Sequence, residues 1–243
     1  GRGVKMKQER LANNPIMTFI EKKLAPLAVE IGSQRHVLAI RASFLQIISF
    51  ITIGSFFLLI TGIPYLEPYI KGFAPALNAV FDLTFNFVAV YFAFAFGANL
   101  GKEYDLDSHI TGLLSVMTFL FATQANYTTE GFSTAYFGVG GFFAAIIFTI
   151  YTVEIYRLCM KKGIFIKSPE GVPPAVSSFF TMLVPPLIIL APVWLLVIVA
   201  NVDVTGLVFQ LFGVFAKGVD SFWSLIAMTI FADNGLFFFG VHP

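Results

Sequence analysis

Charged residues are scarce in this sequence. Only 12% of its 243 residues are Asp, Glu, Lys or Arg, whereas 57% are hydrophobic. A soluble domain carries roughly 25% charged residues, so these charges would not cover the surface of a globular protein of this length. They suffice if lipid replaces water around most of the chain. The composition therefore predicts an integral membrane protein.

Cysteine pairs and the common enzyme motifs are also missing. Cys159 is the only cysteine, which excludes an intrachain disulfide and a metal site built on a cysteine pair. The G-x-x-x-x-G-K-[ST], H-E-x-x-H and G-x-S-x-G patterns do not occur. The basic residues flank apolar segments and form no stripe with aromatic residues, so no nucleic-acid partner is expected. We expect neither a cofactor nor a metal.

What the sequence does contain is a series of long apolar segments. A helix needs about 20 apolar residues to cross a hydrocarbon core of about 30 Å. Five segments are candidate spans, the third being the shortest: 37–62, 76–100, 110–127, 134–156 and 177–200. The first is too long for a signal-peptide core and is expected to stay in the membrane. The expected fold class is all-α, a polytopic membrane protein with five transmembrane helices.

The distribution of positive charge predicts the orientation of these spans. All of the 15 lysines and arginines except Lys71 and Lys217 lie around the start of the first span, between spans two and three, or between spans four and five. Cytoplasmic loops carry the excess of such residues. The N-terminus is therefore predicted to be cytoplasmic and the end of the fifth span to lie outside.

Two segments outside the five spans have a different character. Apolar residues recur at three- and four-residue steps over 15–35, which predicts an amphipathic helix that Pro26 kinks or divides. It either lies on the cytoplasmic membrane surface or packs on its own protein. Beyond residue 200, the short apolar segments 207–217 and 222–232 predict an interfacial or re-entrant segment, with a broken sixth span as the alternative.

Polar residues within or beside the spans are candidate functional groups. Asp82 and Asn86 lie one turn apart on the same face of the second span, where they form either an intramembrane polar site or a pair that reaches the outer interface. Glu154 is expected to pair at the surface with Arg157 or Lys161. The glycines of 137–142 are expected inside the fourth span, where small residues favour helix packing.

The three histidines differ in their surroundings. His36 is expected to anchor the chain at the membrane interface, and His109 to cap the third span or face solvent. His242 follows an aromatic segment with Asp233 and Asn234 nearby. A neutral imidazole there could bond a sugar hydroxyl or pass a proton. We take His242 as the candidate substrate-binding residue, with Asn234 and Asp233 as secondary candidates.

Seven segments of the sequence together carry a resemblance to one known family: 19–26, 31–41, 53–60, 95–97, 152–157, 169–176 and 234–242. They resemble the IIC subunits of bacterial sugar phosphotransferase systems, in the branch for lactose, cellobiose and diacetylchitobiose. The resemblance covers nearly the whole chain from residue 16. The segment 234–242 resembles the family's Gly-x-His segment, which implies that His242 contacts the sugar.

This resemblance implies both a fold and an activity. Such subunits have about ten transmembrane helices, of which the first five build a homodimer interface and the rest hold the sugar. They sit in the bacterial plasma membrane and carry a β-linked disaccharide inward. The cytoplasmic IIB protein, which acts with IIA, supplies the phosphoryl group from its own cysteine. The chain would then divide into a cytoplasmic segment 1–36, a dimerisation half 37–200 and the start of the sugar-binding half, 201–243.

The sequence departs from the family pattern in two places. Pro243 follows His242, where the family has glycine, and family members are nearly twice as long. The missing part would carry the family's glutamate near the phosphate-accepting hydroxyl and most of the pocket. The resemblance therefore leaves two functions open. One is a sugar permease, and the other is a truncated dimerisation module that does not transport. A channel is not favoured, because the spans show no polar pore stripe.

Overall fold

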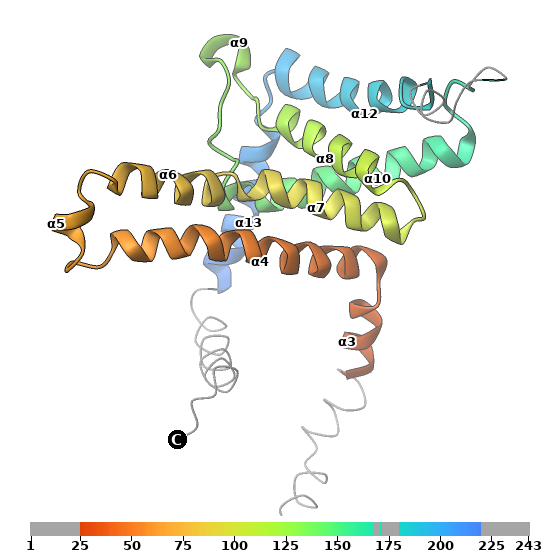
Figure 1. The fold of residues 1–243 in the computed structure, drawn as a ribbon. Helices are drawn as coiled ribbons and strands as arrows, with labels where there is room; N and C mark the ends of the chain where they lie inside the picture. The colour runs from red at the N-terminus through yellow and green to blue at the C-terminus, as the bar shows by residue number, and fades with distance from the viewer. Residues whose placement is uncertain (1–24, 168–170, 172–179, 220–243) are drawn as a thin grey trace, which may run out of the picture.

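The computed structural model describes residues 25–167, 171 and 180–219, and within these ranges every regular element is a helix (Figure 1). Six helices run side by side as a bundle: α4 (Arg35–Thr61), α6 (Ala74–Phe85), α7 (Val88–Glu103), α8 (Ser108–Ala122), α10 (Phe142–Lys162) and α12 (Val184–Trp194). The predicted segment 222–232 lies outside the described residues. The all-helical prediction is confirmed for the part of the chain that the structure describes.

Helix α7 lies at the centre of the bundle, between α4, α8 and α10. Its side chains Phe92 and Phe96 are fully buried. On the face toward α8, a Cβ atom on Gly97 would lie 2.6 Å from the Thr111 carbonyl oxygen, and one on Gly101 would collide with the Thr111 side chain. These two glycines let the α7 and α8 backbones approach closely, as small residues do in membrane helix pairs.

Three helical stretches among the described residues are long and apolar enough to cross a membrane: Arg35–Thr61, Ala74–Glu103 and Val139–Lys162. A fourth span is possible by length if Val184–Val199 and Val204–Phe212, which are bent by 87°, are counted together. Helix α8 is apolar but has only 15 residues, a rise of about 22 Å. The membrane character is thus supported, whereas the predicted number of five spans is not confirmed.

The second span is broken between α6 and α7, which the sequence did not predict. The break frees backbone groups that must find partners at membrane depth. The Ala89 N–H donates to the Phe137 carbonyl at 2.8 Å, and the Tyr91 hydroxyl donates to the Leu83 carbonyl at 2.9 Å. The break is therefore stabilised by a loop 48 residues away in the chain and by the neighbouring turn.

The prediction that the glycines of 137–142 lie inside the fourth span is confirmed only in part, because Gly140 and Gly141 belong to the candidate span Val139–Lys162 whereas Gly138 precedes it. Val139–Gly141 forms a single 3₁₀ turn, and α10 begins only at Phe142. A Cβ atom on Gly141 would collide with the Tyr136 carbonyl oxygen, so glycine is needed at this position. A Cβ atom on Gly138 would lie 3.4 Å from the Phe85 carbonyl oxygen, in ordinary contact with the break in the second span.

The bundle has two ends, named here after the helices beside them. At the α9 end, α9 (Tyr127–Glu130) follows α8, and the π-helical turn Leu195–Val199 extends α12. The side chain of Asn201 bonds twice to Asn126, each time at 2.7 Å. Beyond this contact the chain turns sharply into α13 (Val204–Val219), and the predicted short helix 207–217 lies within α13.

At the α3 end, α3 (Ala25–Gly32) projects away from the bundle and runs across the direction of α4 (Figure 1). Pro26 lies in its first turn. Val29 is 71% exposed and Ile31 is 47% exposed. These exposed apolar side chains suit a membrane surface, whereas contact of α3 with its own protein is with α4.

Candidate functional site

The residues predicted to contact sugar, His242, Asn234 and Asp233, lie outside the described residues, so their role stays a prediction. The other predicted polar site is described. The Asn86 side chain donates to Asp82 Oδ1 at 3.3 Å at the end of α6, and both side chains are exposed. The two residues are thus paired as their spacing suggested, at the break in the second span.

A polar cluster that the sequence only partly predicted lies at the α3 end. It consists of Arg35, His36, Tyr104, Glu154 and Arg157, and is called the Tyr104 cluster below. The start of α4 supplies the first two residues, the residue after α7 supplies Tyr104, and α10 supplies the last two. The up-and-down packing of these helices brings the three segments together, although they lie far apart in the sequence.

Glu154 is the shared acceptor of this cluster. Its Oε1 accepts a hydrogen bond from the Tyr104 hydroxyl and lies 3.2 Å from His36 Nε2. Its Oε2 lies 3.2 Å from Arg157 Nη1. The predicted pair between Glu154 and Arg157 is confirmed. His36 does more than anchor the chain at the interface, because it contacts both Glu154 and Tyr104.

The ring of Tyr104 lies between two guanidinium groups. Arg157 Cζ is 4.0 Å from the ring centre and Arg35 Cζ is 5.5 Å from it. Burial raises the pKa of Tyr104 to about 12, and the hydrogen bond to Glu154 and the charge of that carboxylate act in the same direction. The phenol therefore stays protonated and keeps its role as donor. The cluster ties α4, α7 and α10 together at one end.

Asp107, next to this end of the bundle, caps α8. Its carboxylate accepts from the backbone N–H groups of His109 and Ile110 at 2.9 and 3.1 Å. The His109 side chain is exposed. Of the two alternatives for His109, the structure supports the solvent-facing one, and the capping role belongs to Asp107.

A second polar group lies inside the bundle and was missed by the sequence analysis. The Asn99 amide on α7 donates to Ser43 Oγ at 3.0 Å and to Gln46 Oε1 at 3.1 Å, both on α4. Asn99 is 9% exposed and Ser43 is fully buried. The signal was present, because Asn99 and Gln46 are polar residues within predicted spans, where each needs a partner.

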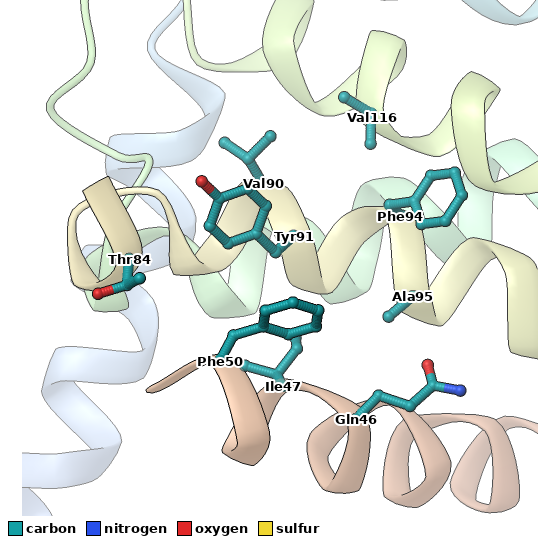
Figure 2. A pocket seen from close by; sticks show the side chains of 9 residues that line it. All are labelled: Gln46, Ile47, Phe50, Thr84, Val90, Tyr91, Phe94, Ala95 and Val116. Carbon is teal, nitrogen blue, oxygen red and sulfur yellow. The ribbon is translucent and has the colours of Figure 1, made fainter. Parts of the chain in front are cut away.

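The hollows among the described residues include a groove and a smaller hollow at the α9 end. A groove of about 580 Å³ runs between α4 and α7, with contributions from α6 and α8 (Figure 2). A hollow of about 440 Å³ at the α9 end is lined mainly by apolar side chains together with Tyr127, Trp194 and Gln124. The Gln124 amide is already bonded to Thr123 and Ser133. Neither lining offers the convergent polar groups that a sugar needs.

Comparisons with known proteins identify the family. A family model described as "Phosphotransferase system, EIIC" matches residues 41–243. The chain belongs to this family. It is 34% identical over 201 residues to a putative permease IIC component, YwbA, of Bacillus subtilis, with 72% of this chain and 44% of that protein covered. It is 33% identical over 195 residues to a cellobiose-specific EIIC component of Geobacillus stearothermophilus, with 72% of this chain and 43% of that protein covered.

A solved structure shows the same fold. The chain is similar to the crystal structure of the transporter ChbC, the IIC component of an N,N'-diacetylchitobiose-specific phosphotransferase system. The TM-score is 0.78 at 30% identity, and the match covers 92% of this chain and 57% of that one. The resemblance seen in the sequence is thus confirmed. The chain spans about half the length of the curated relatives it matches.

Proposed function

We propose that the chain is a membrane permease component of a phosphoenolpyruvate-dependent sugar phosphotransferase system. It would translocate a β-linked disaccharide of the cellobiose, diacetylchitobiose or lactose type while IIB, recharged by IIA, phosphorylates the sugar. The observation that carries this proposal is the EIIC family match over residues 41–243. Relatives named for cellobiose and lactose support the sugar class.

Within this function, residues 37–200 form the dimerisation half and residues 201–243 begin the sugar-binding half. His242, with Asn234 and Asp233, contributes to the sugar site. Two copies of the chain associate in the membrane. The phosphoryl donor residue belongs to IIB, so the chain itself supplies binding and translocation. The contact between Asn126 and Asn201 lies at the junction between the two halves.

The proposed location is the bacterial plasma membrane, with the N-terminus in the cytoplasm. The positions of the lysines and arginines support this orientation. The α3 end, with the Tyr104 cluster, then faces the cytoplasm, where IIB acts. Helix α3 would lie along the inner membrane surface, and its exposed residues Val29 and Ile31 would contact lipid.

A second candidate function is a dimerisation module that does not transport. The observation that favours it is the mainly apolar lining of the groove between α4 and α7 and of the hollow at the α9 end, where the described residues offer no convergent polar groups for a sugar. Such a module would fold and associate but would enclose no disaccharide.

Phosphorylation of a labelled disaccharide separates the two functions. Membrane vesicles that contain the chain are supplied with phosphoenolpyruvate and the soluble phosphotransferase proteins. The permease proposal predicts that labelled cellobiose or diacetylchitobiose becomes phosphorylated, and that His242→Ala abolishes the reaction. If the full-length cellobiose-specific relative is active under the same conditions and this chain is not, the dimerisation module is the correct function.

A further inference from the structure

Arg41 lies on the outer side of α4, near the end of this helix that carries α3. Helix α4 has 27 residues, a rise of about 40 Å, which matches the thickness of a bilayer with its headgroup layers, about 40–45 Å. Its first two turns therefore lie among the headgroups. Arg41 is about 9 Å along the helix from Arg35, where the headgroups give way to acyl chains. A charge at this level is costly unless an opposite charge reaches it.

Neither Arg41 nor Arg35 has a carboxylate partner in the part of the chain that the structure describes. Both side chains are exposed. The guanidinium carbon of Arg35 lies 5.5 Å from the centre of the Tyr104 ring, a contact that satisfies none of its N–H donors. The carboxylate of Glu154 is engaged by other cations of the Tyr104 cluster. Glu30 on α3 forms no ion pair with either arginine among the described residues. The acceptor for these two guanidinium groups is therefore expected outside the described protein.

The surface of α4 around and below Arg41 is apolar. Leu38, Leu45 and Ile48 are 37%, 61% and 54% exposed. All three lie within about 60° of Arg41 around the helix, whereas the buried residue Ala39 lies on the opposite side. A cation above an exposed apolar strip matches the outline of a phospholipid, whose phosphate lies above its acyl chains.

Helix α3 leaves this surface open and extends its character. It turns away from the bundle at the start of α4 and runs across the direction of that helix (Figure 1). Val29 and Ile31 are exposed on it, so α3 and the outer face of α4 present apolar side chains to the same leaflet. A soluble acidic protein reaches the arginines but not the apolar strip below them. A lipid of that leaflet contacts both, and the observations therefore favour a lipid.

We propose that Arg41, together with Arg35, binds the phosphate of an anionic phospholipid whose acyl chains lie along the exposed apolar strip of α4. A guanidinium group donates paired N–H···O bonds to a phosphate. The net negative charge of a lipid such as phosphatidylglycerol adds an attraction that zwitterionic phosphatidylcholine lacks. The two arginines are about 120° apart around the helix, and their long side chains extend to a common headgroup. The proposal is independent of sugar transport.

Native mass spectrometry of the detergent-purified chain tests the proposal. The chain is titrated with phosphatidylglycerol or with phosphatidylcholine of the same acyl chains, and the bound lipids are counted. The parent chain is expected to bind phosphatidylglycerol more tightly. Arg41→Gln should lower the affinity for phosphatidylglycerol roughly fivefold, the loss expected for one basic residue at a membrane surface. Arg41→Lys should keep most of the affinity, because the positive charge remains.

Lys161→Gln is the matched control. Lys161 is exposed in the last turn of α10, which lies at the same end of the bundle as α3. Its replacement removes the same charge as Arg41→Gln but lies outside the proposed site, so the affinity for phosphatidylglycerol should change little. Equal losses in Lys161→Gln and Arg41→Gln would overturn the proposal, because the overall charge of this end would then determine binding.

Competition separates a lipid from other ligands that carry phosphate. Excess inorganic phosphate at constant ionic strength should not displace phosphatidylglycerol, because it makes no contact with the apolar strip. Displacement would assign the arginines to a soluble anion and overturn the proposal. Unchanged affinity for phosphatidylglycerol in both Arg41→Gln and Arg35→Gln would refute it, and weaker binding of a soluble IIB protein by these variants would then assign the arginines to that partner. Lipid binding is measured without sugar or phosphoryl donor, so failure of sugar phosphorylation would count against the proposed function alone.

Discussion

The Asn99 side chain donates a hydrogen bond to Ser43 Oγ at 3.0 Å and so joins α7 to α4 in the buried part of the bundle. The Ser43 hydroxyl in turn donates a hydrogen bond to the Ala39 carbonyl at 2.6 Å. Asn99 also holds Gln46. One amide thus bonds to two polar side chains of α4 and links the two helices through them.

We expect Asn99→Leu to destabilise the folded chain by about 1–2 kcal/mol, because two interhelical hydrogen bonds are lost at about 0.6–1 kcal/mol each. The free energy of unfolding in mixed micelles of increasing SDS content measures this loss. Asn86→Leu is the control, since Asn86 is exposed and bonds only to Asp82 within its own helical segment. An equal loss of stability in both variants would contradict the role given to Asn99.

The close approach of α7 and α8 predicts that Gly97→Val prevents correct packing. A Cβ atom at this position would meet the Thr111 backbone and the Ser115 side chain, and overpacking of this kind costs about 1–3 kcal/mol or more. Size-exclusion chromatography in detergent should show loss of the monodisperse peak. Gly72→Ala is the control, because nothing lies within 4 Å of a Cβ atom there, and its profile should match that of the parent.

The Tyr104 cluster predicts an unusual titration. Because the pKa of Tyr104 is raised from 10.0 to about 12, the folded state binds this proton more tightly than the unfolded state does. The contribution of Tyr104 to stability is therefore present below about pH 10 and is lost as the pH rises toward 12. Absorbance of phenolate in the ultraviolet should show a late-titrating component that becomes smaller in Tyr104→Phe, beside that of other tyrosines such as Tyr136, whose pKa burial also raises.

Glu154→Gln provides the matched test of the cause. It removes the negative charge beside the phenol, so the pKa of Tyr104 should move back toward its ordinary value. Glu130→Gln, which changes an exposed carboxylate at the α9 end, should leave the titration unchanged. Because burial is the largest cause and remains in this variant, only part of the shift should be lost. A titration of Tyr104 that is unchanged in Glu154→Gln would show that the carboxylate makes no contribution.

The orientation also gives a testable outcome. Single cysteines at Ser33 beside α3 and at Thr129 in α9 lie at opposite ends of the bundle, and both positions are exposed. In intact cells, a membrane-impermeant maleimide should label Thr129→Cys but not Ser33→Cys. In broken cells, the same reagent should label both variants. The reverse labelling pattern would place the N-terminus outside.

Much of the fold could be predicted because the bilayer imposes local rules. An apolar run long enough to cross the membrane must be a helix, and α4 (Arg35–Thr61) lies within two residues of the predicted range 37–62 at both ends. The predicted span 134–156 begins earlier than the helical segment, which starts at Val139 with a 3₁₀ turn and continues as α10 from Phe142. The apolar composition continues through the glycines, but the backbone at Gly141 passes close to the Tyr136 carbonyl, and α10 begins only after it at Phe142.

The polar contacts could be predicted only where both partners are near in sequence. Glu154 and Arg157 lie one turn apart, so their pair follows from helical geometry. Tyr104 is 50 residues from Glu154, and their hydrogen bond depends on how α7 packs beside α10. The break after Phe85 likewise depends on the carbonyl of Phe137, a partner that periodicity does not reveal.

Calorimetric titration of cellobiose, lactose and diacetylchitobiose into the chain in nanodiscs tests the central claim most directly. A full-length cellobiose-specific relative serves as the positive control. The permease account predicts saturable binding of at least one disaccharide, with loss of that binding in His242→Ala. Absence of binding to the chain, together with binding to the relative, would contradict the account and leave a dimerisation module without a sugar site.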